Sequence, residues 1–302
     1  MTTAVIVDAI RTASGKGKPG GQLSGVHPAD LLSQVLRGLI DRTGLDPALV
    51  DDVIGGCVGQ AGEQALNITR SAVLGAGFPD AVPATTVDRQ CGSSQQAAHF
   101  VAQGILAGAY EIGIACGVES MSRVPMGTAP MGKDAFGPAV AARYREGLIN
   151  QGVSAELIAA KWKFDRTTLD EFSARSHALA ATADFSSEIL PVEVEGRQVI
   201  ADETVRATTT AEGLAGLEPS FRDERLAARF PEIDWKITPG NSSPLTDGAS
   251  AVLIMSEQKA RALGLRPRAR FHSFSVTGSD PLLMLTGVIP ATQRVLAKSG
   301  LS

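Results

Sequence analysis

Short runs of apolar and β-branched residues alternate with helical patterns over the first 117 residues, and this alternation restricts the chain to a small set of folds. Strands are expected at 4–7, 52–58, 84–88 and 111–117, and helices beginning near 28, 67 and 92. Strands that alternate with helices form a sheet whose two faces the helices cover. The sequence therefore predicts an α/β domain.

The pattern changes after Glu119, where the sequence becomes more polar and less regular until about Lys236. The elements expected beyond Glu119 are helices at 154–163, 168–181 and 257–263 and strands at 247–256 and 268–276. This order predicts an α/β domain that is interrupted by an insertion and followed by the beginning of another region.

Composition excludes several classes of protein. The 302 residues carry a net charge of −4, so no overall positive field favours nucleic acid or anionic membranes. Three cysteines give neither a disulfide framework nor the spacing of a zinc site, which predicts a reducing, cytoplasmic location. The N-terminal stretch lacks the pattern of a signal peptide, and no apolar run approaches a membrane span. We expect neither a metal nor a membrane.

Cys91 stands where a β-branched run ends and small residues open a helix, in TTVDRQCGSSQQAAHF. A thiol at a helix N-terminus faces unpaired backbone N–H groups and the positive end of the helix dipole, which favour the thiolate. The small residues after Cys91 leave room for a bulky substrate. Cys57 and Cys116 each end a strand between small residues, which favours burial. From these residues alone Cys91 is either a nucleophile or a packed core thiol.

No histidine is placed to act as the direct base of Cys91. His99 follows eight residues later on the same expected helix, roughly 12 Å along its axis. His27 precedes a helix and is expected at its cap, His177 falls within the insertion, and His272 falls in an expected strand. This arrangement disfavours a cysteine hydrolase.

Several long blocks, in order, resemble those of the thiolase family, and together they span the chain. They are AIRTASGKGKPGGQLSGVHPADL, DDVIGGCVGQAGEQALNITRSAVLGAGFP, VPATTVDRQCGSSQQA, IACGVESMSRVP and GNSSPLTDGASAVLIMSE. The resemblance implies a transferase of fatty-acid and lipid degradation. Such an enzyme forms an acyl-cysteine and cleaves 3-ketoacyl-CoA with CoA, or condenses acetyl-CoA in reverse.

The resemblance also implies roles for individual residues. Cys91 matches the acyl-accepting nucleophile, Ser243 a serine that contacts the pantetheine arm, and Arg206 a basic residue near the CoA nucleotide. The positions that match the lining of the pantetheine tunnel are Phe221, Pro239, Gly240 and Met284. Coenzyme A and acyl-CoA would be substrates and partners, with no separate cofactor, no nucleic acid and a homodimer or homotetramer as the assembly.

The fold implied by the resemblance has two similar five-stranded halves, stacked in five α-β-α-β-α layers, with an inserted loop domain. The N-terminal half would hold 1–118 and 245–266, the loop domain 119–244, and the truncated beginning of the C-terminal half 267–302. Three later motifs of the family do not occur in the 302 residues: Asn-Glu-Ala-Phe, Gly-His-Pro and Cys-x-Gly-x-Gly.

The absent motifs leave two explanations open, a fragment of a longer gene product or a natural short form. They also predict that the 302 residues acylate Cys91 without cleaving a carbon–carbon bond, because that cleavage needs acid–base groups. Two other functions compete: a CoA- or acyl-CoA-binding protein that does not turn over, and a decarboxylating condensing enzyme. The Glu-Ser-Met-Ser and Gly-Asn-Ser-Ser blocks disfavour the condensing enzyme.

The substrate expectation depends on a short stretch of the insertion. Short-chain members of the family carry His-Met-Gly where this chain has Asn150, Gln151 and Gly152. Loss of the methionine predicts a degradative enzyme that accepts 3-ketoacyl chains longer than acetoacetyl. The alternative is drift in a variable loop.

Overall fold

The computed structural model describes residues 2–302, which divide into two compact units. Unit 1 holds the described residues up to Gly132 together with Asp184–Thr204 and Leu245–His272. Unit 2 holds Lys133–Ala183, Val205–Pro244 and Ser273–Ser302. The boundaries of these two units differ from those of the domains expected from the family. The expected domain boundaries stay a prediction.

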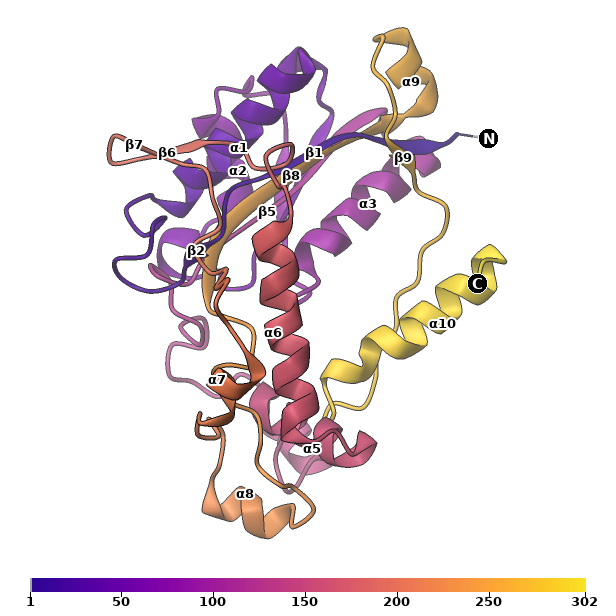
Figure 1. Cartoon of the computed structure of the whole chain (residues 1–302). Helices are drawn as coiled ribbons and strands as arrows, with labels where there is room; N and C mark the ends of the chain where they lie inside the picture. Colours follow the sequence, from indigo (N-terminus) through magenta and orange to yellow (C-terminus); the bar gives the residue numbers. More distant parts are fainter. Residues whose placement is uncertain (1) are drawn as a thin grey trace. The chain divides into compact units, whose positions relative to one another are not determined.

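Unit 1 is built on one sheet in the order β4-β3-β5-β8-β1-β9, with β2 paired to β8 (Figure 1). The strands are β1 (Ala4–Arg11), β2 (Gly15–Lys16), β3 (Asp52–Gly56), β4 (Ala84–Val87), β5 (Ile112–Ser120), β8 (Thr246–Ser256) and β9 (Ala269–Arg270). β3 runs parallel to β4 and β5, while β8 runs antiparallel to β5 and β1. The expected strand at 268–276 is confirmed only over the two residues of β9.

Helices cover both faces of this sheet, which confirms the predicted α/β class. The helical elements of unit 1 are α1 (Pro28–Thr43), α2 (Ile68–Gly75), α3 (Ser93–Ala107), α9 (Glu257–Ala262) and the 3-10 turns η1 (Pro47–Leu49) and η2 (Gly62–Gln64). Alternate residues of β5, among them Ile112 and Ile114, join the core with α1 and α2. The residues between them face α3, since Gly113 lies against Val101.

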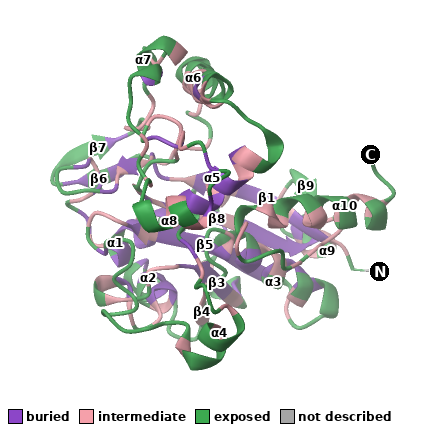
Figure 2. Cartoon of the chain, turned by 90° about the horizontal axis from the view of Figure 1, so that it is seen from below, coloured by how far each residue is buried: buried purple, intermediate pink, exposed green. Residues whose placement is uncertain are grey.

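The start and the buried face of α1 follow the sequence closely. His27 caps the helix by accepting a hydrogen bond from the Ala29 N–H at 3.2 Å, and Pro28 is the first helical residue. One face is fully buried: Leu31, Leu32, Val35, Leu36 and Leu39. Each such side chain contributes about 1.5–3 kcal/mol by burial. Figure 2 shows the buried residues gathered on the central strands and on this helix.

A hairpin that the sequence did not predict belongs to unit 1. It consists of β6 (Val192–Val194) and β7 (Arg197–Val199) and lies within Asp184–Thr204. Arg11 anchors this segment, because its guanidinium donates to Glu188 at 2.7 Å and to Asp202 at 2.7 and 3.1 Å. These contacts explain why part of the expected insertion packs with the sheet.

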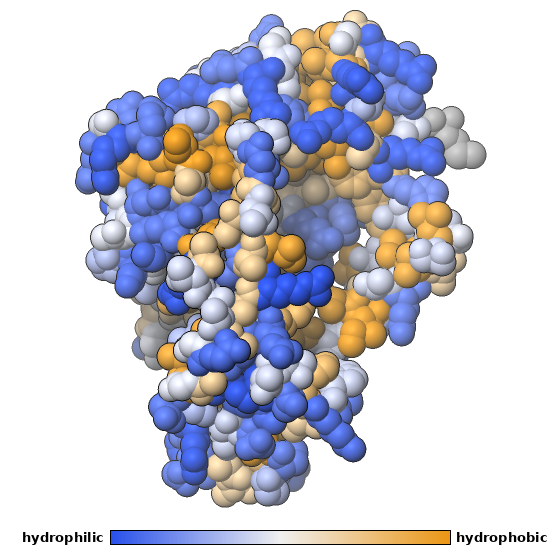
Figure 3. Space-filling model, viewed as in Figure 1, coloured by the Kyte–Doolittle hydropathy of each residue, from blue (hydrophilic) through white to orange (hydrophobic). Residues whose placement is uncertain are grey.

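Unit 2 is helical, and its core is small. Its elements are α4 (Gly137–Arg143), α5 (Gln151–Trp162), α6 (Arg166–Thr182), α7 (Ala211–Ala215), α8 (Glu224–Arg229), the 3-10 turn η3 (Leu285–Gly287) and α10 (Val288–Ser299). The helices predicted at 154–163 and 168–181 correspond to α5 and α6. The core contains Ile149, Val153, Leu157, Phe230 and Ile233. Apolar side chains remain exposed around α10, including Val288 and Ile289 (Figure 3). Within residues 2–302 no helix has the length and apolar character that crossing a bilayer requires.

Candidate active site

Cys91 lies in the turn that joins β4 to α3, and its side chain is exposed. The turn stands at the carboxyl end of the parallel strands β3, β4 and β5, the edge at which α/β sheets commonly bind ligands. α3 begins two residues later, so its first N–H groups lie next to the thiol in the sequence. This is the strand–turn–helix context that the sequence predicted for Cys91.

The backbone around Cys91 is tightly turned. Gln90 has a left-handed conformation with φ 48°, which is uncommon for a residue with a side chain. Its N–H donates to the Asp88 carboxylate at 2.7 Å, and the Gly92 N–H donates to the Arg89 carbonyl at 3.1 Å. The turn therefore has its own hydrogen bonds, independent of the sheet ladder.

Two glycines form the floor beneath the start of α3. Gly56 on β3 and Gly117 on β5 are register partners. A Cβ on Gly56 would lie 2.3 Å from the Ser94 nitrogen, and a Cβ on Gly117 would lie 1.9 Å from the Ser94 hydroxyl oxygen. Only glycine therefore allows the helix to begin this close to the sheet. The sequence analysis noted small residues beside Cys57 and Cys116 but gave these glycines no role of their own, so it missed this one.

The space on the other side of the turn is open. A Cβ on Gly92 would meet only the Arg89 carbonyl oxygen, at 3.4 Å, among the described atoms within 4 Å. Glycine is therefore not required here by neighbouring groups. The expected room for a bulky substrate beside Cys91 stays a prediction.

A half-buried carboxylate fixes the same edge of the sheet. Glu119, at the end of β5, accepts hydrogen bonds from the Val58 N–H at 2.9 Å, the Gly59 N–H at 3.2 Å and the Gln64 amide at 2.8 Å. Gln64 in turn accepts from the Ser120 N–H at 2.7 Å. These bonds join the loop after β3 to the end of β5. The Glu-Ser-Met-Ser block was the only signal for them in the sequence.

The other two cysteines are buried, as predicted. Burial, together with the nearby carboxylates of Glu119 and Asp88, raises the pKa of Cys57 to about 12. Burial alone raises the pKa of Cys116 to about 12. Both thiols are therefore neutral near pH 7, whereas Cys91 is the exposed thiol of the three.

The histidines have other environments. His177 accepts a hydrogen bond from the Arg206 N–H at 3.2 Å, and His27 caps α1. His99 lies on α3, where burial and the nearby Arg89 guanidinium lower its pKa. His272 follows β9 and lies outside any strand. The prediction that His272 lies in a core strand is therefore wrong.

All six residues predicted to contact CoA belong to unit 2. Phe221 and Met284 are both associated with α5. The Phe221 ring packs so closely on Gly152 that a Cβ there would lie 2.3 Å from ring atoms. Met284 has a left-handed backbone with φ 43°, and the Ser154 hydroxyl of α5 donates to the carbonyl of nearby Leu282 at 2.8 Å.

The loop that carries Pro239, Gly240 and Ser243 is fastened to α6. Asn241 donates to the buried Asp170 carboxylate at 2.9 Å, and Asp170 is also paired with Arg166 at 2.7 Å. A Cβ on Gly240 would lie 2.6 Å from Leu214 of α7. Sequence reasoning missed Asp170 and Asn241, because their pairing joins residues that are 71 positions apart.

Asn150 and Gln151 stand at the start of α5. The Asn150 side chain accepts a hydrogen bond from the Val153 N–H at 3.0 Å and so serves as the helix cap. Gln151 is the first helical residue and is exposed. The Asn150 side chain is therefore engaged in a hydrogen bond with the backbone of α5.

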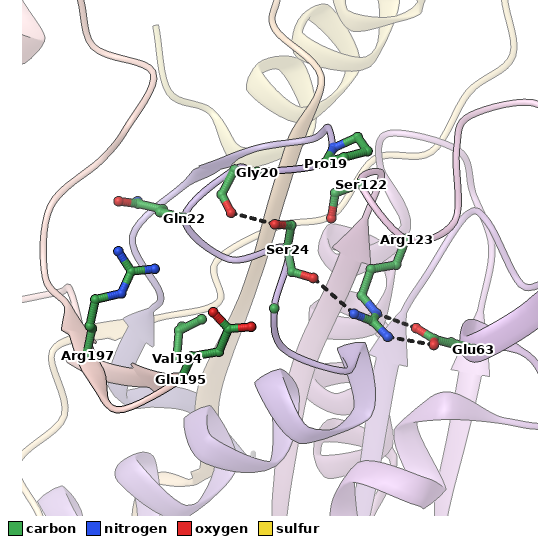
Figure 4. A pocket seen from close by; sticks show the side chains of 12 residues that line it. Pro19, Gly20, Gln22, Ser24, Glu63, Ser122, Arg123, Val194, Glu195 and Arg197 are labelled. Carbon is green, nitrogen blue, oxygen red and sulfur yellow. Dashed lines mark hydrogen bonds and ion pairs between the residues drawn. The ribbon is translucent and has the colours of Figure 1, made fainter.

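A separate cavity of about 620 Å³ opens in unit 1 between the loop at 19–25 and the β6–β7 hairpin. Figure 4 shows Arg123 in this cavity, where its guanidinium pairs with Glu63 and donates to the Ser24 carbonyl at 3.0 Å. Cys91 is not among the lining residues. Within residues 2–302 no three His, Cys, Asp or Glu side chains gather as a metal site would require.

Known proteins resemble this chain over its whole length. The family described as "Thiolase, N-terminal domain" matches residues 4–258. The chain is 45% identical over 314 aligned positions to "Steroid 3-ketoacyl-CoA thiolase FadA6" of Mycobacterium tuberculosis, covering 100% of this chain and 74% of that protein. It is 42% identical to a "3-ketoacyl-CoA thiolase" of Photobacterium profundum, covering 100% of this chain and 77% of that protein. The crystal structure of the Bacillus anthracis acetyl-CoA acetyltransferase superposes with a TM-score of 0.84 at 36% identity, covering 100% of this chain and 77% of that one.

Proposed function

Since this chain belongs to the thiolase family and is an acyltransferase of that type, we propose that Cys91 is the nucleophile that accepts the acyl group. The observation that carries this assignment is the exposed thiol just before α3, the helix whose first residues, Ser93 and Ser94, lie on Gly56 and Gly117. The other two thiols are buried, and their pKa values are raised to about 12. A thiolate is the reactive form, so these two are poor nucleophiles near neutral pH.

The proposed reaction has two covalent steps. The Cys91 sulfur bonds to the 3-keto carbon of a 3-ketoacyl-CoA, the bond between C2 and C3 breaks, and its electron pair leaves on acetyl-CoA, which takes up a proton. The thiolate of a second CoA then attacks the acyl-cysteine carbonyl and releases a shortened acyl-CoA and the Cys91 thiolate. In the second step the acyl group passes between two thioesters, so that step needs only a poised thiol, whereas the carbon–carbon cleavage of the first step also needs an acid–base group for the proton.

The proposed contacts with CoA lie in unit 2. Arg206 would face the nucleotide and Ser243 the pantetheine arm. Phe221, Pro239, Gly240 and Met284 would line the tunnel. The fastening of the Pro239–Ser243 loop to α6 through Asp170 supports this assignment, since a binding loop must be held in place. CoA acts here as a substrate.

The proposed substrates are 3-ketoacyl-CoA thioesters longer than acetoacetyl-CoA. Asn150 is engaged as the cap of α5, and no methionine stands at 151 to wall off the pocket. A relative that is 45% identical is named for a steroid 3-ketoacyl-CoA. One methylene changes affinity by only about 1–3 kcal/mol in an apolar pocket, so a broad range of chain lengths is expected. A clear preference for acetoacetyl-CoA over a medium-chain 3-ketoacyl-CoA in kcat/KM would contradict this proposal.

Acyl-enzyme formation tests the nucleophile directly. The protein is incubated with acetyl-CoA, and the adduct is located by intact mass and peptide mapping. Cys91→Ser is expected to abolish the adduct, and Cys116→Ala is expected to retain it. An adduct on Cys57 or Cys116, or one that survives in Cys91→Ser, would overturn the assignment. Light scattering of the same protein tests the inferred homodimer or homotetramer.

A further inference from the structure

We propose that Ser93 is a positioning residue that holds Cys91 in place for acyl transfer. This inference rests on the proposed role of Cys91 as the nucleophile. Ser93 is the first residue of α3 and is 4% exposed, whereas Cys91, two residues earlier, is exposed. Its hydroxyl group thus stands on the protein side of the turn whose outer side carries the thiol.

The Ser93 hydroxyl closes the turn around the nucleophile with two hydrogen bonds. Its oxygen accepts from the Arg89 N–H at 2.9 Å, and its hydrogen is donated to the Gln90 carbonyl at 2.6 Å. The Ser93 N–H also donates to that carbonyl, at 3.0 Å. One side chain therefore bonds the two residues directly before Cys91.

These bonds hold a conformation that is unfavourable by itself. Gln90 has φ 48°, and a non-glycine residue adopts such a conformation only where surrounding contacts determine it. The two bonds to the Gln90 carbonyl and the bond from the Gln90 N–H to Asp88 supply those contacts. Without the hydroxyl group we expect Gln90 to relax and the Cys91 sulfur to move.

Ser93 is itself fixed by the glycine floor. A Cβ on Gly56 would lie 2.8 Å from the Ser93 Cβ, so the serine rests directly on β3. The sheet therefore fixes the position of the Ser93 hydroxyl group, and the hydrogen bonds of that group hold Arg89 and Gln90 of the turn in place. The rate of acyl transfer should depend on Ser93 although its side chain is turned away from the acyl group.

The variant Ser93→Ala tests this role, with Ser71→Ala as the matched control. Ser71 lies on α2 of the same unit, and its side chain is exposed and away from the turn that carries Cys91. The maximal rate of Cys91 acylation and the half-saturating concentration are measured with acetyl-CoA. Displacement of a reacting atom costs rate, so Ser93→Ala is expected to lower the maximal rate by about tenfold or more. The half-saturating concentration should stay within about twofold, and Ser71→Ala should match the unaltered protein.

Two results would overturn the positioning role. One is an acylation rate in Ser93→Ala that equals that of Ser71→Ala, and the other is a change confined to the half-saturating concentration. Alkylation of Cys91 by iodoacetamide needs no CoA site, and it is expected to slow roughly threefold or more in Ser93→Ala. If the unaltered protein forms no acyl-cysteine, the proposed function fails, while the alkylation rates still decide the role of Ser93.

Hydrogen exchange in the unaltered protein covers the case in which Ser93→Ala does not fold. The Arg89 amide is expected to exchange slowly, because its N–H is bonded to the buried Ser93 hydroxyl. If the Arg89 amide exchanges at the rate of an unstructured peptide, the Ser93 hydroxyl does not hold the turn in place, and the proposal is wrong.

Discussion

The two units hold their proposed functional groups by different means. In unit 1 Cys91 stands on a turn whose position is set by a sheet, a helix and two glycines in contact with backbone atoms. In unit 2 the six proposed CoA contacts lie on loops and at the ends of short helices, around a core of five buried apolar residues. Side-chain hydrogen bonds such as Asn241 to Asp170 fasten these loops.

This difference fits the tasks of the two groups. A reacting atom must be placed to within about half an ångström, and regular elements provide that precision. A long flexible ligand such as CoA can be held by many contacts of modest accuracy. Changes in the floor of unit 1 should therefore affect the rate of chemistry, and changes in unit 2 should affect binding.

The largest expected effect is the difference in reactivity among the three thiols. At pH 7.5 only about 10⁻⁴ to 10⁻⁵ of a thiol whose pKa is raised to about 12 is ionised, and Cys57 and Cys116 are also buried. We expect iodoacetamide to label Cys91 more than about 1,000-fold faster than either. Since a raised pKa keeps a thiol neutral, their labelling should increase as pH rises. Peptide mapping after timed labelling gives the rates. If Cys57 is labelled about as fast as Cys91, the predicted difference in thiol reactivity is wrong.

Gly56→Ala should have the next largest effect. The added Cβ meets the backbone of α3, at 2.3 Å from the Ser94 nitrogen, so no side chain can rotate to make room. We expect a loss of about 2–3 kcal/mol in the free energy of unfolding and an approximately hundredfold slower acylation of Cys91. Gly278→Ala is the control, because nothing within the described residues lies within 4 Å of its Cβ. A Gly56→Ala protein with unchanged acylation would break the link between the floor and the nucleophile.

Within unit 1 the sequence predicted the local features and missed a long-range attachment, and the reason is the distance along the chain between the interacting residues. The cap at His27, the buried face of α1 and the strand–turn–helix around Cys91 depend on residues within a few positions of one another. The attachment of Asp184–Thr204 to the sheet depends on Arg11 and Asp202, which are 191 positions apart. No local pattern predicts that pair.

The same reasoning explains what the sequence missed at the site. Gly56 and Gly117 are visible as small residues, but their role follows only from the register between β3 and β5 and the position of α3. Glu119 and Gln64 pair across 55 positions. The CoA contacts came only from resemblance to the thiolase family, because isolated loop residues carry no periodic signal.

A third prediction addresses unit 2. In Gly152→Ala the new Cβ would lie 2.3 Å from the Phe221 ring, so the ring must move out of its place on α5. We expect the half-saturating concentration of CoA to rise roughly tenfold, which corresponds to about 1.4 kcal/mol. Alkylation of Cys91 should not change. Kinetics with varied CoA and timed labelling measure the two effects, and a slower Cys91 with unchanged CoA dependence would reverse the assignment of tasks.

The smallest expected effect comes from the attachment of Asp184–Thr204 to the sheet, and it has a defined pH dependence. Burial by itself would raise the pKa of Asp202, but hydrogen bonds from the Arg11 guanidinium and the Ser14 N–H outweigh it and hold the pKa below its ordinary value. Asp202→Asn should therefore lower the free energy of unfolding by about 1 kcal/mol at pH 7.

Because the pKa of Asp202 is lower in the folded state, its stabilising effect is fully present above the unfolded value, which is about 4. The effect is lost as pH falls through the lower, folded value. Urea unfolding at pH 7 and at pH 3 should show the difference between Asp202→Asn and the unaltered protein shrinking at the acidic pH. Glu193→Gln is the control. Glu193 lies on β6 of the same segment, and its side chain forms no ion pair within residues 2–302. This variant should leave the free energy of unfolding unchanged at both pH values. A difference for Asp202→Asn that persists undiminished at pH 3 would mean that hydrogen-bond geometry, and not the carboxylate charge, attaches this segment to the sheet.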